Sequence, residues 1–279
     1  MNSGLVVQTT ATWNGEKQVF ILNSPNEGSQ KNWISQGLTA EMSTVIADLR
    51  VNGKSYGPHG FLIHLRDPAG NIVPGVILCD MGRKTTGNDL DNASISFKNL
   101  EIPKSSLLNR FADIQHNEYV QKTKIKMRIE VIGQRLLTGR IAIAEAALMF
   151  CRKLFKQTKQ YTEQKKCWSP GGEQMLGDIP HIRALFLEGE ETLTQLDQFC
   201  LAVETALSKS LIKNEIPSAE LVQAIAVAKI CAVEYSINLA FRLKQEVGSY
   251  ALMGGNGFEH FDFLQCCKFA EVSCIHKSC

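Results

Sequence analysis

The hydrophobic pattern changes character once along the chain. Up to about residue 112, short apolar and β-branched runs recur roughly every ten to fifteen residues, and turn-forming residues such as Asn23-Ser24-Pro25 and Asn52-Gly53 separate them. This pattern is typical of strands in a small antiparallel barrel or sandwich. The runs that carry the prediction are Val19–Leu22, Thr44–Leu49, Gly60–Leu65, Val73–Leu78 and Ala93–Phe97.

After about residue 116 the apolar residues recur at spacings of three and four, which predicts amphipathic helices. One run extends from Ile125 to Phe155 and a second from Ile182 to about Leu211. A third follows Pro217-Ser218, a suitable helix start, and ends near Gly248. Helices of this length pack as an up-down bundle, and Gln164–Gly177 is expected to be the loop between the first two.

These patterns together predict a multidomain α+β protein. Residues 1–113 are expected to form the antiparallel β-barrel or sandwich, and residues 114–271 the helical bundle. Residues 272–279 form a divergent tail. Such a combination of domains does not by itself indicate a function.

Composition argues against several classes of function but does not point to a particular one. The chain has 279 residues, of which 44% are hydrophobic and 21% charged, and its net charge of +2 is too balanced to suggest a nucleic-acid partner. No uninterrupted apolar run approaches the roughly 18 residues that a membrane helix needs, and residues 1–12 lack the pattern of a secretory signal. The nine cysteines contain no CxxC pair, so reduced thiols are expected, and no metal site.

Two segments are candidates for binding chemistry. Trp33 is followed closely by Ser35, and a flat indole beside a hydroxyl suits a planar heteroaromatic cofactor, although a lone tryptophan also serves as a core anchor. Gly254-Gly255-Asn256-Gly257 follows the third helical run. It is either a glycine-rich helix exit or a nest of backbone amides for a pyrophosphate.

Seven motifs occur in a consistent order along the chain. They are Trp33-Ile34-Ser35, His59–Asp67, Phe97–Pro103, Leu107–Ala112, Leu137–Arg140, Gly254–Phe258 and Glu271. In this order they resemble the acyl-CoA dehydrogenase and oxidase superfamily, and most closely the peroxisomal acyl-CoA oxidases. The resemblance covers roughly residues 8 to 271.

The resemblance implies an FAD enzyme of fatty-acid β-oxidation, acting on acyl-CoA with O2 to give trans-2-enoyl-CoA and H2O2. It places Glu271 as the catalytic base, with Arg140 near it. The residues implied to hold FAD are Trp33 and Ser35 at the isoalloxazine, and Lys165, Trp168, Gly254, Gly255, Asn256 and Gly257 at the rest of the cofactor. Lys165 stands where the family has an arginine, and lysine lacks the planar guanidinium that can donate two hydrogen bonds to one phosphate. The resemblance further implies a homodimer with FAD across the interface, a peroxisomal location, and neither nucleic acid nor a membrane span.

Departures from the family pattern leave alternatives open. The N-terminal helical domain and its flavin-binding loop have no counterpart, and residues 272–279 lack the family's glycine, its next helix and a peroxisomal C-terminal address. We therefore expect a truncated or alternatively spliced form with impaired activity. The alternatives are a catalytically inactive binding or regulatory partner of intact oxidases, and an acyl-CoA dehydrogenase.

Overall fold

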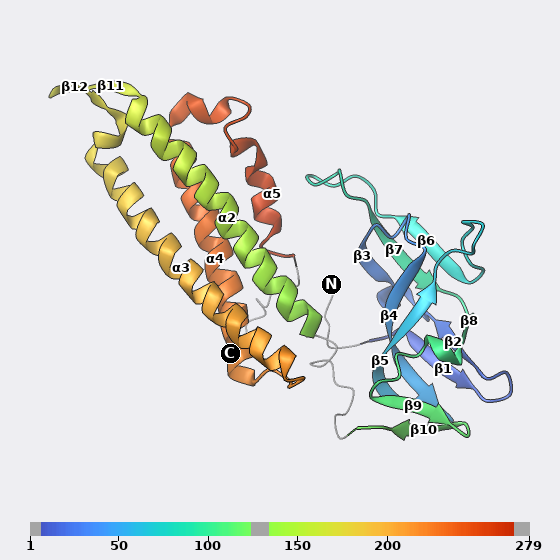
Figure 1. Ribbon diagram of the computed structural model, residues 1–279. Coiled ribbons are helices and arrows are strands. Elements are labelled where there is room, and N and C mark those ends of the chain that lie inside the picture. The colour runs from blue at the N-terminus through green and yellow to red at the C-terminus, as the bar shows by residue number, and fades with distance from the viewer. Residues whose placement is uncertain (1–6, 124–133, 271–279) are drawn as a thin grey trace. The chain divides into compact units, whose positions relative to one another are not determined.

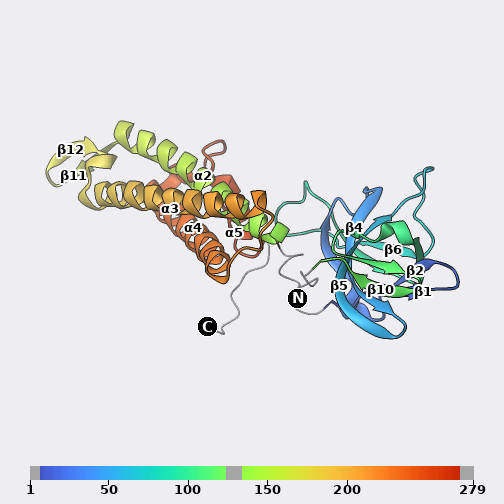
Figure 2. The ribbon, with the colours of Figure 1, turned by 60° about the horizontal axis from the view of Figure 1, so that its bottom comes forward.

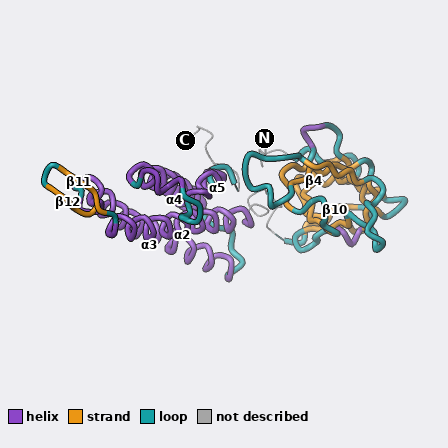
Figure 3. The backbone as a smooth tube through the Cα atoms, turned by 90° about the horizontal axis from the view of Figure 1, so that it is seen from above, coloured by secondary structure: helices purple, strands orange, loops and turns teal. Residues whose placement is uncertain are grey.

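The computed structural model describes residues 7–123 and 134–270. It contains two compact units that divide between Gly133 and Gln134 (Figure 1). Strands build the first unit and helices the second, apart from one small hairpin in the helical unit (Figure 3). The expected α+β class is confirmed. The first unit extends beyond residue 113, where the sequence placed the boundary, because two further strands belong to it.

The β unit is a sandwich of two main sheets around one core. One sheet has five strands in the order β5-β4-β1-β2-β8, and the other has three in the order β3-β7-β6. Pairing is antiparallel except between β1 and β4, which are parallel. The strands are β1 Thr10–Asn14, β2 Val19–Asn23, β3 Lys31–Ser35, β4 Met42–Val51, β5 Lys54–His64, β6 Val76–Asp80, β7 Asn92–Phe97, β8 Leu100–Pro103, β9 Ala112–Gln115 and β10 Glu118–Gln121.

Alternation along the strands builds this core. Phe20 and Phe61 of the larger sheet are fully buried and stack edge to face, with ring centroids 5.2 Å apart. Ile95 and Phe97 of β7 point into the same cluster from the other sheet. Burying large aromatic side chains from both sheets stabilises the sandwich by about 1.5–3 kcal/mol for each.

The hairpin β9–β10 was not expected from the sequence, which predicted helix after about residue 116. Its turn residues His116 and Asn117 both have left-handed φ values, 50° and 64°. The indole Nε1 of Trp13 in β1 donates to Asn117 Oδ1 at 3.1 Å. This contact joins positions far apart in sequence, so no local periodicity could indicate it.

Among the described residues, the helical unit is a bundle of α2 (Gln134–Gln164), α3 (Pro180–Ile212) and α4 (Ala219–Glu246) with short additions (Figure 2). Cys151 Sγ of α2 contacts the Ser236 carbonyl of α4, and the rings of Tyr161 and Tyr250 stack farther along. The second pair lies C-terminal to the first along both segments, so α2 and α4 run parallel. The elements are α2 Gln134–Gln164, β11 Lys166–Ser169, β12 Gly172–Met175, α3 Pro180–Ile212, α4 Ala219–Glu246 and α5 Phe261–Cys266, with 3-10 turns at Leu176–Asp178, Gly248–Leu252 and Phe258–His260.

The second and third helical runs are confirmed. The hydroxyl of Ser218 accepts from the Leu221 amide at 3.2 Å, which caps α4 as expected after Pro217. The prediction of a loop over Gln164–Gly177 is wrong in part, because β11 and β12 form a hairpin there. Residues 124–133 of the first predicted run lie outside the described residues.

Helix α4 is long and apolar enough to pass a test for a membrane span by length and composition, which the sequence analysis did not expect. The same properties characterise the central helix of a bundle. The helix packs against α2 and α3 and carries the buried residues Ile225, Ala228, Ala232, Val233, Leu239, Ala240 and Leu243.

Candidate functional site

Trp33 and Ser35 lie on β3, an edge strand of the three-stranded sheet. The indole is 57% exposed, so it is not the buried core anchor that the sequence left open. The pairing of β3 with β7 shifts register between Lys31 and Ile34, which places a bulge at the tryptophan. A bulge redirects a side chain away from the normal alternation, and here it accompanies an exposed ring.

The backbone at Trp33 is strained. Its φ of +60° lies in the left-handed region, which a bulky residue rarely adopts. Its amide donates to the Sδ of Met81, just past the end of β6, at 3.1 Å. Strain of this kind costs about 1–3 kcal/mol and is concentrated at functional sites. Trp33 therefore marks the strongest candidate site in the β unit.

Lys165 and Trp168 lie at the far end of α2. Both side chains are exposed, and the Trp168 ring, on β11, is 81% accessible. The Lys165 amide donates to the Tyr161 carbonyl at 2.9 Å, and its carbonyl accepts from Leu176 at 2.7 Å. The backbone at Lys165 is thus fixed on both sides, while its ammonium group faces solvent.

The glycine turn lies at the same end of the helical unit. The Tyr161 ring of α2 stacks on Tyr250, with centroids 3.9 Å apart, and the Asn256 amide group donates to the Tyr250 carbonyl. A Cβ at Gly257 would meet Leu154 of α2 at 3.4 Å. The structure therefore brings Lys165 and the turn, which are far apart in sequence, to one end of the bundle.

The turn itself presents backbone amides to an anion. Gly255 and Gly257 have φ values of +86° and +93°, which side-chain-bearing residues seldom adopt. Their amides donate to the two carboxylate oxygens of Glu259, each at 2.9 Å. Among the described residues, no atom outside the adjacent ones lies within 4 Å of a Cβ built at Gly254 or Gly255, so there is space beside this backbone. The turn is an amide nest, and the anion that it holds in this structure is the Glu259 carboxylate.

Asn256 has a different position from its neighbours. Its side chain is buried, and its oxygen accepts from the Phe258 amide at 3.0 Å while its nitrogen donates to Tyr250. Both ends of the amide group are therefore used inside the turn. Asn256 therefore helps to shape the nest.

Arg140 lies near the opposite end of α2 from Lys165. With a rise of about 1.5 Å per residue, the two are separated by roughly 37 Å along the helix. Glu271 lies outside the described residues, but the chain just before it is fixed. The Lys229 ammonium donates to the carbonyls of Lys268 and Ala270. Lys229 and Arg140 both precede the Cys151–Ser236 contact along their parallel helices, so they lie in the same half of the bundle.

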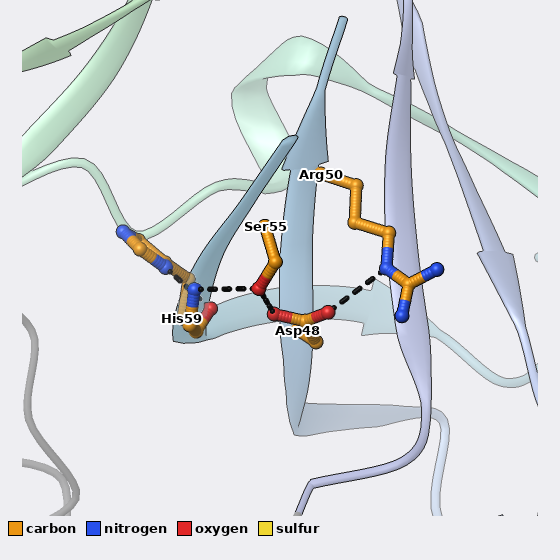
Figure 4. Close-up of polar contacts among 5 residues, drawn as sticks. Asp48, Arg50, Ser55 and His59 are labelled. Atoms are coloured by element: carbon orange, nitrogen blue, oxygen red, sulfur yellow. Dashed lines mark hydrogen bonds and ion pairs between the residues drawn. The ribbon is translucent and has the colours of Figure 1, made fainter. Parts of the chain in front are cut away.

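A second polar cluster lies in the β unit and contains a serine, a histidine and an aspartate (Figure 4). Ser55 Oγ donates to Asp48 Oδ1 at 2.5 Å and accepts from the Gly57 amide, while Arg50 Nε donates to Asp48 at 2.9 Å. His59 Nδ1 pairs with the Gly57 carbonyl at 3.0 Å, not with the serine. Nucleophilic catalysis needs a base on the hydroxyl. The cluster instead fixes the irregular pairing of β4 with β5.

The motif His59–Asp67 is also structural. His59 is buried at 1% exposure, and its desolvation lowers the pKa of the imidazole. Arg66 donates to the Gly70 carbonyl at 2.9 Å, and Asp67 Oδ1 accepts from the Ala69 and Asn71 amides. Hydrogen bonds to the carboxylate, with those from Asn71 contributing most, lower the pKa of Asp67. The motif therefore forms the end of β5 and the turn after it.

Three residues of these sites were not predicted from the sequence: Met81, Lys229 and Glu259. An acidic residue two positions after the last glycine of the turn was a visible signal for Glu259, because carboxylates recur at the first turn of helices. Met81 and Lys229 had no such signal, since both contacts are long-range. No group of three metal-binding side chains is found in the described ranges.

The sequence and the structure were compared with those of known proteins. No family model matches the chain. It is 32% identical over 186 residues to the peroxisomal acyl-coenzyme A oxidase 3 of Arabidopsis thaliana, covering 64% of this chain and 28% of that protein. It is 29% identical over 179 residues to the acyl-coenzyme A oxidase-like protein of mouse, covering 63% and 28%.

The chain is a homologue of the acyl-CoA oxidases. Solved structures of the family share its fold. The acyl-CoA oxidase of tomato superimposes with a TM-score of 0.80 at 20% identity, over 96% of this chain and 43% of that one. Acyl-CoA oxidase-2 of Caenorhabditis elegans, bound with FAD, ascaroside-CoA and ATP, gives 0.80 at 17% identity, over 96% and 42%. The chain thus spans less than half the length of these acyl-CoA oxidases.

Proposed function

We propose that the protein binds FAD and acts in acyl-CoA oxidation, converting acyl-CoA and O2 to trans-2-enoyl-CoA and H2O2. The observation that carries the proposal is the amide nest at Gly254–Gly257, which accommodates an anionic carboxylate and shares one end of the bundle with Lys165 and Trp168. Amides and an ammonium group suit the phosphates of a dinucleotide, and an exposed indole suits a flat ring.

The roles divide between the two ends of the cofactor. Trp33 and Ser35 would face the isoalloxazine, and Lys165, Trp168 and the glycine amides would hold the pyrophosphate end. Asn256 would act indirectly by shaping the turn. The bound flavin would supply a hydride acceptor.

Proton removal is assigned to Glu271, which lies outside the described residues. A desolvated carboxylate has a raised pKa and can accept a weakly acidic α-proton. Lys229 holds the carbonyl of Ala270, the residue immediately before Glu271, and Arg140 lies in the same half of the bundle as Lys229.

An absorption spectrum of the purified protein, with and without added FAD, tests the proposal. Retained flavin bands are the expected result, and Trp33→Ala and Lys165→Met should each weaken retention. A colourless protein that does not retain added FAD would contradict cofactor binding. That result would favour the second candidate, an inactive partner of intact oxidases that dimerises through the bundle.

Two further points complete the proposal. Peroxide formed from acyl-CoA under air would separate an oxidase from a dehydrogenase, which passes its electrons to another protein. A homodimer with FAD across its interface and a peroxisomal location are proposed from the family. Sedimentation of the purified protein, and the location of a tagged full-length chain in cells, would test these two points.

A further inference from the structure

Glu259 occupies the nest that the proposed function assigns to phosphate. Its two carboxylate oxygens each accept one amide hydrogen bond at 2.9 Å, from Gly255 and from Gly257. The side chain is exposed and follows the buried Phe258, which anchors the turn to the bundle core. The carboxylate can therefore leave the amides without disturbing that core.

We infer that the Glu259 carboxylate is a built-in competitor for the diphosphate of the cofactor at the glycine turn. This rests on the proposed function for the identity of the cofactor, but not for the competition itself. An amide proton that is donated to a carboxylate is not available to a phosphate oxygen, and two anions at one site repel each other. A diphosphate that reaches Gly255 and Gly257 must displace the carboxylate first.

The electrostatics of the turn agree with this arrangement. Amide hydrogen bonds, first that of Glu259 itself and then those of Gly255 and Gly257, lower the pKa of the Glu259 carboxyl, and the nearby His260 acts in the same direction. The group is therefore an anion at neutral pH, as a competitor for phosphate must be.

The test compares the full-length protein with Glu259→Gln and Glu259→Ala. Asp262→Asn is the matched control, because Asp262 is an exposed acid of the next turn and its carboxylate pairs with Gln265 instead of the glycine amides. The probe is inorganic pyrophosphate, and the readout is the amide resonances of Gly255 and Gly257. Neither glutamine nor alanine brings a negative charge to the glycine amides, so the competing anion is absent from both variants. Both Glu259 variants should therefore respond at roughly tenfold lower pyrophosphate concentration than the wild type and Asp262→Asn.

If pyrophosphate shifted the Gly255 and Gly257 amide resonances at the same concentration in all proteins, the competition would be overturned. It would also be overturned if these resonances did not shift in either Glu259 variant. A parallel titration with FAD keeps the two proposals distinct. If no protein binds FAD but the Glu259 variants respond more readily to pyrophosphate, the flavin assignment fails and the competition stands. If all bind FAD equally and pyrophosphate does not distinguish them, the flavin assignment stands and the competition fails.

Discussion

The ammonium group of Lys229 lies 2.6 Å from the carbonyl oxygen of Ala270. Lys229 is 3% exposed in the middle of α4, and it also donates to the Lys268 carbonyl at 3.0 Å. A buried charge needs hydrogen-bond partners of this kind. The contact fastens residues 268–270, which directly precede Glu271 in the sequence, to α4.

Replacing Lys229 with Met should release this segment. Two carbonyls lose a charged donor, so we expect a loss of about 1–3 kcal/mol in the free energy of unfolding and faster proteolysis after residue 267. Denaturant unfolding and limited proteolysis measure the two effects. Lys268→Met is the control, because its exposed ammonium pairs only with Glu234 among the interactions found here. Unchanged cleavage in Lys229→Met would contradict the role of the contact.

Gly189 is required by a close helix contact. A Cβ at this position of α3 would lie 2.6 Å from the Phe155 ring of α2. Gly189→Ala gains about 1 kcal/mol of helix propensity, but overpacking costs about 1–3 kcal/mol. We therefore expect a lower thermal midpoint, measured by circular dichroism. Phe155→Leu should reduce the effect of the alanine, and simple additivity of the two changes would show that the contact is unimportant.

Lys31 should make stability depend on pH. Its half-buried ammonium donates to the Ile46 carbonyl at 2.9 Å, and desolvation lowers its pKa from 10.5 to about 8. Between these two values the unfolded chain binds a proton that the folded protein does not. The contribution of Lys31 to stability therefore rises as pH increases from about 8 to 10.5.

Lys31→Met removes that contribution. At pH 7 the free energy of unfolding should be larger for the variant than for the wild type. By pH 10 the wild type should have become more stable relative to the variant, and the difference should be small. Urea unfolding at several pH values measures this, and Lys54→Met is a control from the same unit with an exposed side chain. A difference between wild type and Lys31→Met that is constant with pH would contradict the expected titration.

Lys165→Arg should strengthen FAD binding. Arginine supplies a planar fork that can hold a phosphate with two hydrogen bonds, whereas lysine acts as a point charge. A gain of about 1 kcal/mol corresponds to roughly fivefold tighter binding by absorbance titration. Lys166→Arg is the matched control. Lys166 is adjacent to Lys165 in the sequence, and its ammonium nitrogen already pairs with Glu173 Oε1 at 2.6 Å. If both substitutions change affinity equally, Lys165 has no specific contact with the cofactor.

The sequence alone determined the elements whose signal is local. The alternation in β7 and the spacing in α3 and α4 predicted those elements, because burial on one face selects apolar residues at the period of the backbone. Asn52-Gly53 predicted the β4–β5 turn, and both residues have positive φ values as that turn requires. The order of the motifs indicated the family, which the relatives then supported.

Only the tertiary structure decided the rest. The short β9–β10 hairpin depends on the Trp13–Asn117 contact, and the strained backbone of Trp33 depends on a bulge and on Met81. Likewise, the structure placed Glu259 on the glycine amides and joined the turn to α2 through Tyr161 and Tyr250. Such contacts join residues that no periodicity relates, so they form only when packing of the whole unit brings the chain segments together.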